Sequence, residues 1–361
     1  MTFKPTANWI IGFTDAEGCF SICITNNEKF IGISFTFYIS QKIKEPLIKY
    51  QEFLKEYIKQ NSISVDTEIP KLVPGNGTEN LRIRQHDLLL KVIRPFFEEF
   101  PLLSSKWQDC QLFFAALDIH KDKQMTNHVR ILKIAHIMFA MNTEGEQRIR
   151  PLTYYENFVK PRFKNKQLWE IACLEAKKGV KEILDRPYPS LTKKFGSISF
   201  LREDYFFGLL TGDGCFHADF DCRKGRTVKV RKSLSISMIK TTRNEELLNA
   251  IAEQFDLTWK KRLSAKNRHS WKIEKSEEIN QILQPFFLKN AKKFPIFKRR
   301  HLECWLTIDK LLKLLKGDLA NFSAKSKVMV LLMEIYNVHD GTYRKYSREE
   351  IINRFRQDWI F

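Results

Sequence analysis

The sequence predicts an α+β protein made of two pseudo-symmetric repeats, each with its own antiparallel sheet. Three observations support this fold class. An apolar segment at residues 9–20 returns at residues 205–216, and both copies end in an acid followed by Gly-Cys-Phe. Other landmarks recur in the same order along the chain. After each copy, the spacing of apolar residues changes from that of a helix to that of a strand.

The matched landmarks indicate where each repeat lies. They are the opening segments, Pro95-Phe96-Phe97 with Pro285-Phe286-Phe287, Cys110 with Cys304, Gly145 with Gly341, and Arg148 with Arg344. We therefore expect one repeat at residues 1–160 and a second at 200–361. The linker at 161–199 is rich in Pro and Lys at its margins, and we expect it to contain a helix over residues 165–185.

Within the first repeat, helical and strand patterns alternate. Asn8 is expected to cap a helix that ends at Gly18. Strands over residues 20–25 and 31–40 follow, each with apolar side chains on one face and polar side chains on the other. The remaining predicted elements are a helix over 45–58, two shorter strands near 63–69 and 81–84, and helices over 87–120 and 127–141. The second repeat follows the same plan.

The strong positive charge points to a polyanionic partner. The chain has 61 Lys and Arg against 42 Asp and Glu, a formal net charge of +19. Such an excess favours nucleic acid first and an anionic membrane second. No apolar run is long enough to predict a membrane-spanning helix, so no membrane partner is expected. Seven cysteines without a C-x-x-C pattern fit a reducing compartment better than a disulfide framework or a zinc module.

Polar strand faces and two basic clusters form the expected nucleic-acid surface. The stretch 223–232 contains six basic residues and no acid, and a second basic cluster surrounds a hairpin at 260–272. A two-stranded ribbon fits the DNA major groove, where polar side chains contact bases and phosphates. The alternative is that lysine-rich turns only keep sheet edges soluble. The candidates for DNA contact are Ser34, Thr36, Tyr38, Ser40, Arg82, Arg84, His217, Asp219, Asp221, Arg223, Lys229, Arg231, Ser233, Ser235, Lys260, Arg262, Arg268 and Lys272.

Each opening segment ends in one acid, Glu17 in the first copy and Asp213 in the second. An acid is slightly unfavourable at the C-terminal end of a helix, so its repetition in register favours a function over simple helix termination. Gly12 and Gly208 would let the two helices pack closely and bring the acids together. Two neighbouring carboxylates suit Mg²⁺, which can activate water against a phosphate. With one acid per repeat and two strands per duplex, the expected product is a double-strand break.

Residues 10–18 and 206–214 resemble the two signature motifs of the single-chain, two-repeat LAGLIDADG homing endonucleases. The motif departs at its sixth position, Asp15 in the first copy and Thr211 in the second, which is not a metal ligand. The resemblance implies an αββαββα fold in each repeat, with the two sheets forming a DNA-binding saddle. It also implies a monomeric, Mg²⁺-dependent, site-specific endonuclease that cuts a long, asymmetric target of double-stranded DNA.

The same resemblance leaves other functions open. Some family members act as maturases, so a splicing cofactor that binds its host intron RNA is the alternative function. A third possibility is a DNA-binding regulator without catalysis. Many members are encoded in organellar introns, and residues 1–8 lack the pattern of an import signal. We therefore expect synthesis inside an organelle, the mitochondrion rather than the chloroplast.

The resemblance assigns the metal to the two acids. Glu17 and Asp213 would bind Mg²⁺, and the backbone carbonyls of Ala16 and Gly212 would be further ligands. Glutamate at position 17 has one more methylene than aspartate, so the two halves are expected to cut at unequal rates.

The resemblance also implies polar and basic residues beside the metal. Gln41 would close the second strand and position water, and Lys240 is its nearest substitute in the second repeat. Lys106 would be the basic residue near the start of a late helix. Its counterpart falls within residues 298–300, with Arg300 in register.

Overall fold

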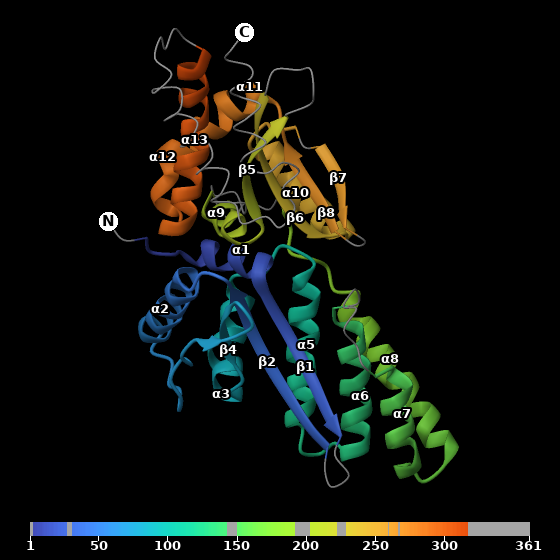
Figure 1. Ribbon diagram of the computed structural model, residues 1–361. Coiled ribbons are helices and arrows are strands. Elements are labelled where there is room, and N and C mark those ends of the chain that lie inside the picture. The colour runs from blue at the N-terminus through green and yellow to red at the C-terminus, as the bar shows by residue number, and fades with distance from the viewer. Residues whose placement is uncertain are drawn as a thin grey trace. The chain divides into compact units, whose positions relative to one another are not determined.

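The computed structural model describes residues 3–26, 31–142, 150–191, 203–221, 229–258, 260–265 and 268–316. The chain forms two compact units. The first unit contains Pro5–Leu209 and Thr241–Leu247, and the second contains the described residues before Pro5, of Leu210–Lys240 and of the chain from Leu248 onward. Each unit has one four-stranded antiparallel sheet (Figure 1), so the predicted α+β class is confirmed. The predicted repeat boundaries stay a prediction, and Gly145, Arg148, Gly341 and Arg344 lie outside the described residues.

In the first unit, a sheet follows directly on helix α1 (Ala7–Glu17). Its strands, in order across the sheet, are β1 (Gly18–Asn26), β2 (Ile31–Gln41), β4 (Glu79–Ile83) and β3 (Val73–Pro74). Phe20 lies at the centre of the apolar face, with ring centroids 5.1 Å from Phe37, 5.8 Å from Phe97 and 5.4 Å from Phe113. The predicted alternation of strand residues therefore holds, because one face forms an aromatic core with helices α4 (Arg94–Glu99) and α5 (Lys106–Lys121).

The remaining helices of the first unit include the predicted ones, and a further helix at residues 152–159 was not predicted. They are α2 (Glu45–Gln60), α3 (His86–Leu88), a π-helical turn (Leu89–Ile93), α4 (Arg94–Glu99), α5 (Lys106–Lys121), α6 (Asn127–Ala140), α7 (Leu152–Val159), a 3₁₀ turn (Lys160–Arg162) and α8 (Lys166–Leu184). The linker helix is confirmed as α8, where the Asn165 side chain accepts a hydrogen bond from Leu168 N at 2.9 Å. Helices α6, α7 and α8 lie side by side (Figure 1).

Two local predictions in this unit are wrong. The cap of α1 is Thr6 rather than Asn8, because Thr6 Oγ1 accepts from Trp9 N at 3.3 Å. Residues 63–69 form no strand. The partner of β4 is instead β3, which a tight turn places beside it, with Gly75 N donating to Thr78 O at 2.7 Å. A short turn brings two strands together at little entropic cost. Residues 63–69 alternate in polarity, but no such turn aligns them with β4.

The second sheet repeats the strand order of the first. Its strands are β5 (Gly214–Asp221), β6 (Lys229–Ile239), β8 (Arg268–Ile273) and β7 (Lys260–Ala265), in that order. The helices after residue 202 are α9 (Glu203–Gly212), α10 (Thr242–Gln254), α11 (Ser276–Glu278), α12 (Gln284–Asn290) and α13 (Ile296–Lys316), with a π turn at Ile279–Leu283 and a 3₁₀ turn at Ala291–Lys293. Phe216 takes the place that Phe20 has in the first unit, with ring centroids 5.4 Å from both Phe287 and Trp305. Across the described residues, no helix is both long and apolar enough to cross a membrane.

Candidate active site

The two motif helices meet at their glycines. A Cβ on Gly12 would lie 2.0 Å from Tyr205 O and 2.9 Å from Leu209 N, and one on Gly208 would lie 2.1 Å from Trp9 O. Side-chain carbon atoms do not approach backbone this closely, so only glycine allows the contact. These five residues all belong to the first unit. The predicted packing of α1 against the beginning of α9 is therefore observed.

Asp15, the sixth motif residue, is a buried anchor. Its carboxylate accepts hydrogen bonds from Leu103 N at 2.9 Å, Ser104 N at 3.2 Å, Ser104 Oγ at 2.5 Å and Tyr205 OH at 2.8 Å. Burial raises the pKa of Asp15, and these hydrogen bonds oppose the rise. The contacts fix the loop before α5 against α1, which positions Lys106 at the start of α5. The resemblance implied only that Asp15 is not a metal ligand; an acid inside an apolar helix was the available signal for a buried hydrogen-bond network.

Four predicted site residues come together where α1 ends. Gln41 Nε2, at the end of β2, donates to Glu17 Oε1 at 2.6 Å. Lys106 Nζ donates to Ala16 O at 2.7 Å and to Thr14 O at 3.3 Å. The side chains of Glu17, Gln41 and Lys106 are only partly buried, so this cluster is open to a ligand.

The acid that follows α9 has a different neighbour. Arg268 Nη2, from β8, lies 3.4 Å from Asp213 Oδ1 and donates to Ser237 O at 3.1 Å. Arg268 was predicted as a DNA contact, and its guanidinium forms an ion pair with the second acid. Lys240, the predicted substitute for Gln41, is exposed just after β6.

A lysine also holds a carbonyl beside the second acid, but it is not the one in sequence register. Lys298 Nζ donates to Gly214 O, and Lys298 is buried, whereas Arg300 is exposed. Counting back from the matched cysteines aligns Arg300 with Lys106. Helix α13 begins directly after Pro295, whereas α5 begins several residues after the corresponding proline, and this difference shifts the register. The catalytic role assigned to Arg300 stays a prediction.

The donor atoms at the two motif ends fit a hard divalent cation. Each end offers a carboxylate, Glu17 or Asp213, and the carbonyl of the preceding residue, Ala16 or Gly212. The last carbonyls of a helix lack intrahelical donors, and an oxygen that accepts one hydrogen bond keeps a second lone pair. Oxygen-only ligands of this kind suit Mg²⁺ better than a transition metal.

The polar face of the first sheet is partly open. The pairing of β2 with β4 places Tyr38 opposite Arg82. Ser34, Arg82 and Arg84 are exposed, while Thr36, Tyr38 and Ser40 are partly buried. Burial raises the pKa of Tyr38 to about 12, and its protonated hydroxyl can both donate and accept hydrogen bonds. This face offers both donors and acceptors to a ligand.

The polar face of the second sheet is less open than expected. Ser233 is 1% exposed and Ser235 is 6% exposed, and Ser235 Oγ lies 2.7 Å from His217 Nε2. Lys232 lies on the opposite, apolar face together with Leu234, and its buried Nζ is 4.8 Å from the centre of the Trp305 ring. Alternation in a sequence shows which residues share a face, but it does not show what covers that face.

The basic hairpin of the second unit is partly neutralised. Lys260 Nζ lies 3.3 Å from Glu274 Oε2, and Lys272 Nζ lies 3.2 Å from Glu274 Oε1. Arg223 lies outside the described residues, and so do the side chains of Asp219, Asp221, Lys229, Arg231 and Arg262.

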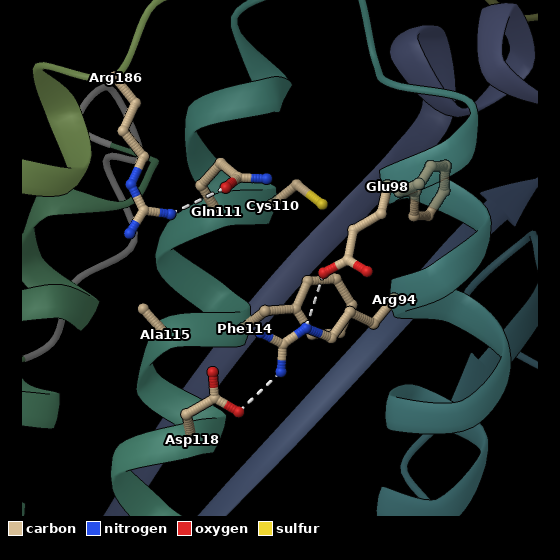
Figure 2. A pocket seen from close by; sticks show the side chains of 9 residues that line it. Arg94, Glu98, Cys110, Gln111, Phe114, Ala115, Asp118 and Arg186 are labelled. Atoms are coloured by element: carbon tan, nitrogen blue, oxygen red, sulfur yellow. Dashed lines mark hydrogen bonds and ion pairs between the residues drawn. The ribbon is translucent and has the colours of Figure 1, made fainter.

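A cavity of about 90 Å³ lies between α4 and α5 (Figure 2). Arg94 crosses it and contacts Asp118 at 2.7 Å and Glu98 at 3.0 Å, while Arg186 donates to Gln111 at 3.1 Å. Arg94 is thus paired with two acids, Arg186 is bonded to an amide, and no predicted site residue lines the cavity. This cavity is therefore not the candidate active site.

Known proteins share both motif regions. Residues 10–117 and 206–305 match the family model described as LAGLIDADG endonuclease. A curated Schizosaccharomyces pombe protein, described as a probable intron-encoded endonuclease, Cox1-I1b, is 32% identical over 132 residues. The aligned part covers 36% of this chain and 31% of that protein, so the chain spans about a third of the length of its curated relative.

Solved structures share the fold over nearly the whole chain. I-SmaMI bound to cleaved DNA has a TM-score of 0.64 and 17% identity, over 96% of this chain and 99% of that one. I-SmaMI bound to uncleaved target in the presence of calcium ions has a TM-score of 0.63 and 17% identity, over 91% and 98%. I-LtrWI bound to target DNA has a TM-score of 0.62 and 21% identity, over 94% and 98%. At these identities, the likeness establishes the fold.

Proposed function

Because this chain belongs to the LAGLIDADG endonuclease family, as its repeated motifs predicted, we propose that it is a site-specific enzyme that cuts both strands of a DNA target. One observation carries the proposal. Each motif helix leads into an acid, Glu17 or Asp213, and beside each acid a lysine, Lys106 or Lys298, donates to a backbone carbonyl. A positively charged group beside a carboxylate suits a phosphodiester, since it can attract the phosphate while the acid binds a cation.

We propose Mg²⁺ as the cofactor, held by Glu17 and Asp213 with the carbonyls of Ala16 and Gly212. When bound, such a cation activates water and stabilises the charge on the phosphate and the leaving oxygen. The protein's own residues orient these groups. Gln41 fixes one oxygen of Glu17 at 2.6 Å and can direct its other hydrogen-bonding atoms toward water.

DNA is the substrate that the charge and the open polar face support. A net charge of +19 favours binding to a polyanion, with affinity that falls steeply as salt rises. Arg82 and Arg84 are exposed beside the polar face of the first sheet, where they can contact phosphates or bases. The matching I-SmaMI and I-LtrWI structures contain DNA. The two polar faces differ in sequence, which supports an asymmetric target bound by one copy of the chain.

Strand-specific cleavage tests the proposal. The substrate is an end-labelled duplex made of the two exons that flank the open reading frame. Glu17→Gln and Asp213→Asn should each lower double-strand cleavage at least about 100-fold while binding persists, because each removes one charge at the reacting phosphate. Glu68→Gln, an exposed acid changed in the same way, is the control and should cut as the wild type does. Wild-type cleavage by both motif variants would overturn the assignment.

The RNA maturase alternative makes a different prediction. A splicing cofactor would bind the host intron RNA more tightly than the exon-junction DNA, and loss of Glu17 and Asp213 would leave splicing unchanged. Both acids are present and have hydrogen-bonding partners beside them, which favours the endonuclease. Intron RNA binding and a mitochondrial location stay predictions; the description of the curated relative as intron-encoded agrees with them.

A further inference from the structure

Three side chains with metal-binding atoms meet where α6, α7 and α8 lie side by side in the first unit (Figure 1). They are His136 from α6, Glu156 from α7 and Cys173 from α8. One ligand atom from each lies within 4.8 Å of the other two. None of the three belongs to the motif ends, and their sequence spacing resembles no zinc-binding motif.

His136 has a buried nitrogen without a hydrogen bond. Its side chain is 5% exposed, and Nε2 approaches Glu156 Oε1 to 3.2 Å without hydrogen-bond geometry. A buried polar atom without a partner is costly, and most such atoms in native proteins are satisfied by a donor, water or an ion. Burial lowers the pKa of His136, which keeps the imidazole neutral and leaves a lone pair available.

We propose that His136, Glu156 and Cys173 bind one Zn²⁺ ion, with water as a fourth ligand. Zinc accepts nitrogen, oxygen and sulfur ligands in tetrahedral geometry, whereas Mg²⁺ requires oxygen ligands. Bond lengths of about 2.0–2.3 Å put neighbouring ligand atoms about 3.3–3.7 Å apart. The separation of 3.2 Å between His136 Nε2 and Glu156 Oε1 is close to this spacing.

Charge and surroundings favour the same ion. A thiolate on Cys173 and a carboxylate on Glu156 together balance the two charges of Zn²⁺. An apolar cluster packs against the site, and Cys173 itself contacts it; its members are Ile131, Leu132, Val159, Ala172 and Ala176. Burial raises the pKa of the Cys173 thiol, so the thiol binds as a thiolate only by releasing its proton to solvent as the metal arrives.

An ion pair between His136 and Glu156 explains less of the arrangement. That pair involves only two of the three side chains and leaves Cys173 without a role. A bound zinc instead joins three helices, and it fastens α7 and α8, which precede the second motif, onto α6 of the first repeat.

Cobalt titration tests this site directly. The full-length protein is stripped with a chelator and titrated with Co²⁺ in excess Mg²⁺. The expected result is uptake of one equivalent with a thiolate-to-cobalt charge-transfer band, displaced by Zn²⁺ and accompanied by proton release. Cys173→Ser should abolish the band. His136→Gln should weaken cobalt affinity at least about 10–100-fold, because mutating residues that only hydrogen-bond to a metal ligand already causes a loss of this size.

Matched variants separate the site from other cysteines, histidines and acids. Cys23→Ser, an exposed thiol, and His128→Gln, on the same helix as His136, should retain the wild-type titration. Glu17→Gln should also retain it, since that acid belongs to the proposed active site. A folded wild type without the thiolate band overturns the proposal. A full equivalent of cobalt bound by Cys173→Ser also overturns it. Because Cys173→His keeps a donor atom, it should bind cobalt without the band even if the serine variant misfolds.

Discussion

The end of α1 and the end of α9 carry acids at equivalent motif positions, but the two acids have different electrostatic neighbours. Glu17 receives a hydrogen bond from the neutral amide of Gln41, at 2.6 Å. Asp213 has the guanidinium of Arg268 at 3.4 Å. A guanidinium paired directly with a carboxylate competes with a metal ion, whereas an amide does not. The lysines Lys106 and Lys298 instead donate to backbone carbonyls. The two repeats therefore share their helices and backbone contacts, but a side chain at the end of a strand gives each acid a different neighbour.

The shared part of the comparison is the glycine contact, and breaking it should have the largest effect. Gly12→Ala would place a methyl group 2.0 Å from Tyr205 O, where backbone of both helices would have to move. We expect a loss of about 3 kcal/mol or more in the free energy of unfolding. Gly179→Ala in α8 is the matched control. Its Cβ would meet nothing within 4 Å, so Gly179→Ala should raise the free energy of unfolding by about 0.5–1 kcal/mol.

Chemical denaturation of the full-length variants measures both changes. Equal stabilities for Gly12→Ala and Gly179→Ala would show that α1 and α9 can separate at no cost, contrary to the packing described. Gly208→Ala should behave like Gly12→Ala, because its Cβ would lie 2.1 Å from Trp9 O.

The lysine beside each acid gives the next test. Lys298→Met should lower cleavage of one DNA strand about 10–100-fold, because a hydrogen bond from a charged group contributes about 1.5–3 kcal/mol. Lys106→Met should do the same to the other strand. Arg300→Met, an exposed residue, should leave both rates within about twofold. Strand-specific rates on doubly labelled DNA measure this, and the opposite ranking of Lys298 and Arg300 would restore the register predicted from sequence.

The sequence was sufficient for features that depend on local pattern. The alternation around Phe20 predicted the strands, and the repeated acids Glu17 and Asp213 marked the motif ends. Gln41 was predicted from the resemblance to the LAGLIDADG family, which implies a polar residue at the end of the second strand, and its amide donates to Glu17. The strands and the motif ends could be predicted because they depend on the spacing of residues along the chain, which folding does not change.

Features that depend on tertiary contact could not be predicted in this way. Arg268 reaches Asp213 only because β6 and β8 pair, and Lys298 reaches Gly214 only because α13 begins early. The burial of Ser233 depends on what covers its sheet, which alternation does not record. His136, Glu156 and Cys173 come from three different helices, so their spacing in the sequence does not predict that they lie close together.

The smallest effect should come from making the two acids alike. Arg268→Gln gives Asp213 a neutral neighbour, as Gln41 is for Glu17. We expect half-maximal cleavage of one strand at an about two- to fivefold lower Mg²⁺ concentration, because an exposed ion pair of this kind contributes about 0.5–1 kcal/mol.

The control is Lys272→Gln, on the same strand β8. It removes one positive charge that does not contact Asp213, and so it controls for weaker attraction of DNA. Titration of each strand's cleavage with Mg²⁺ distinguishes the two variants. Equal shifts for both would mean that Arg268 acts only through the overall charge, and its ion pair with Asp213 would then not distinguish the two acids.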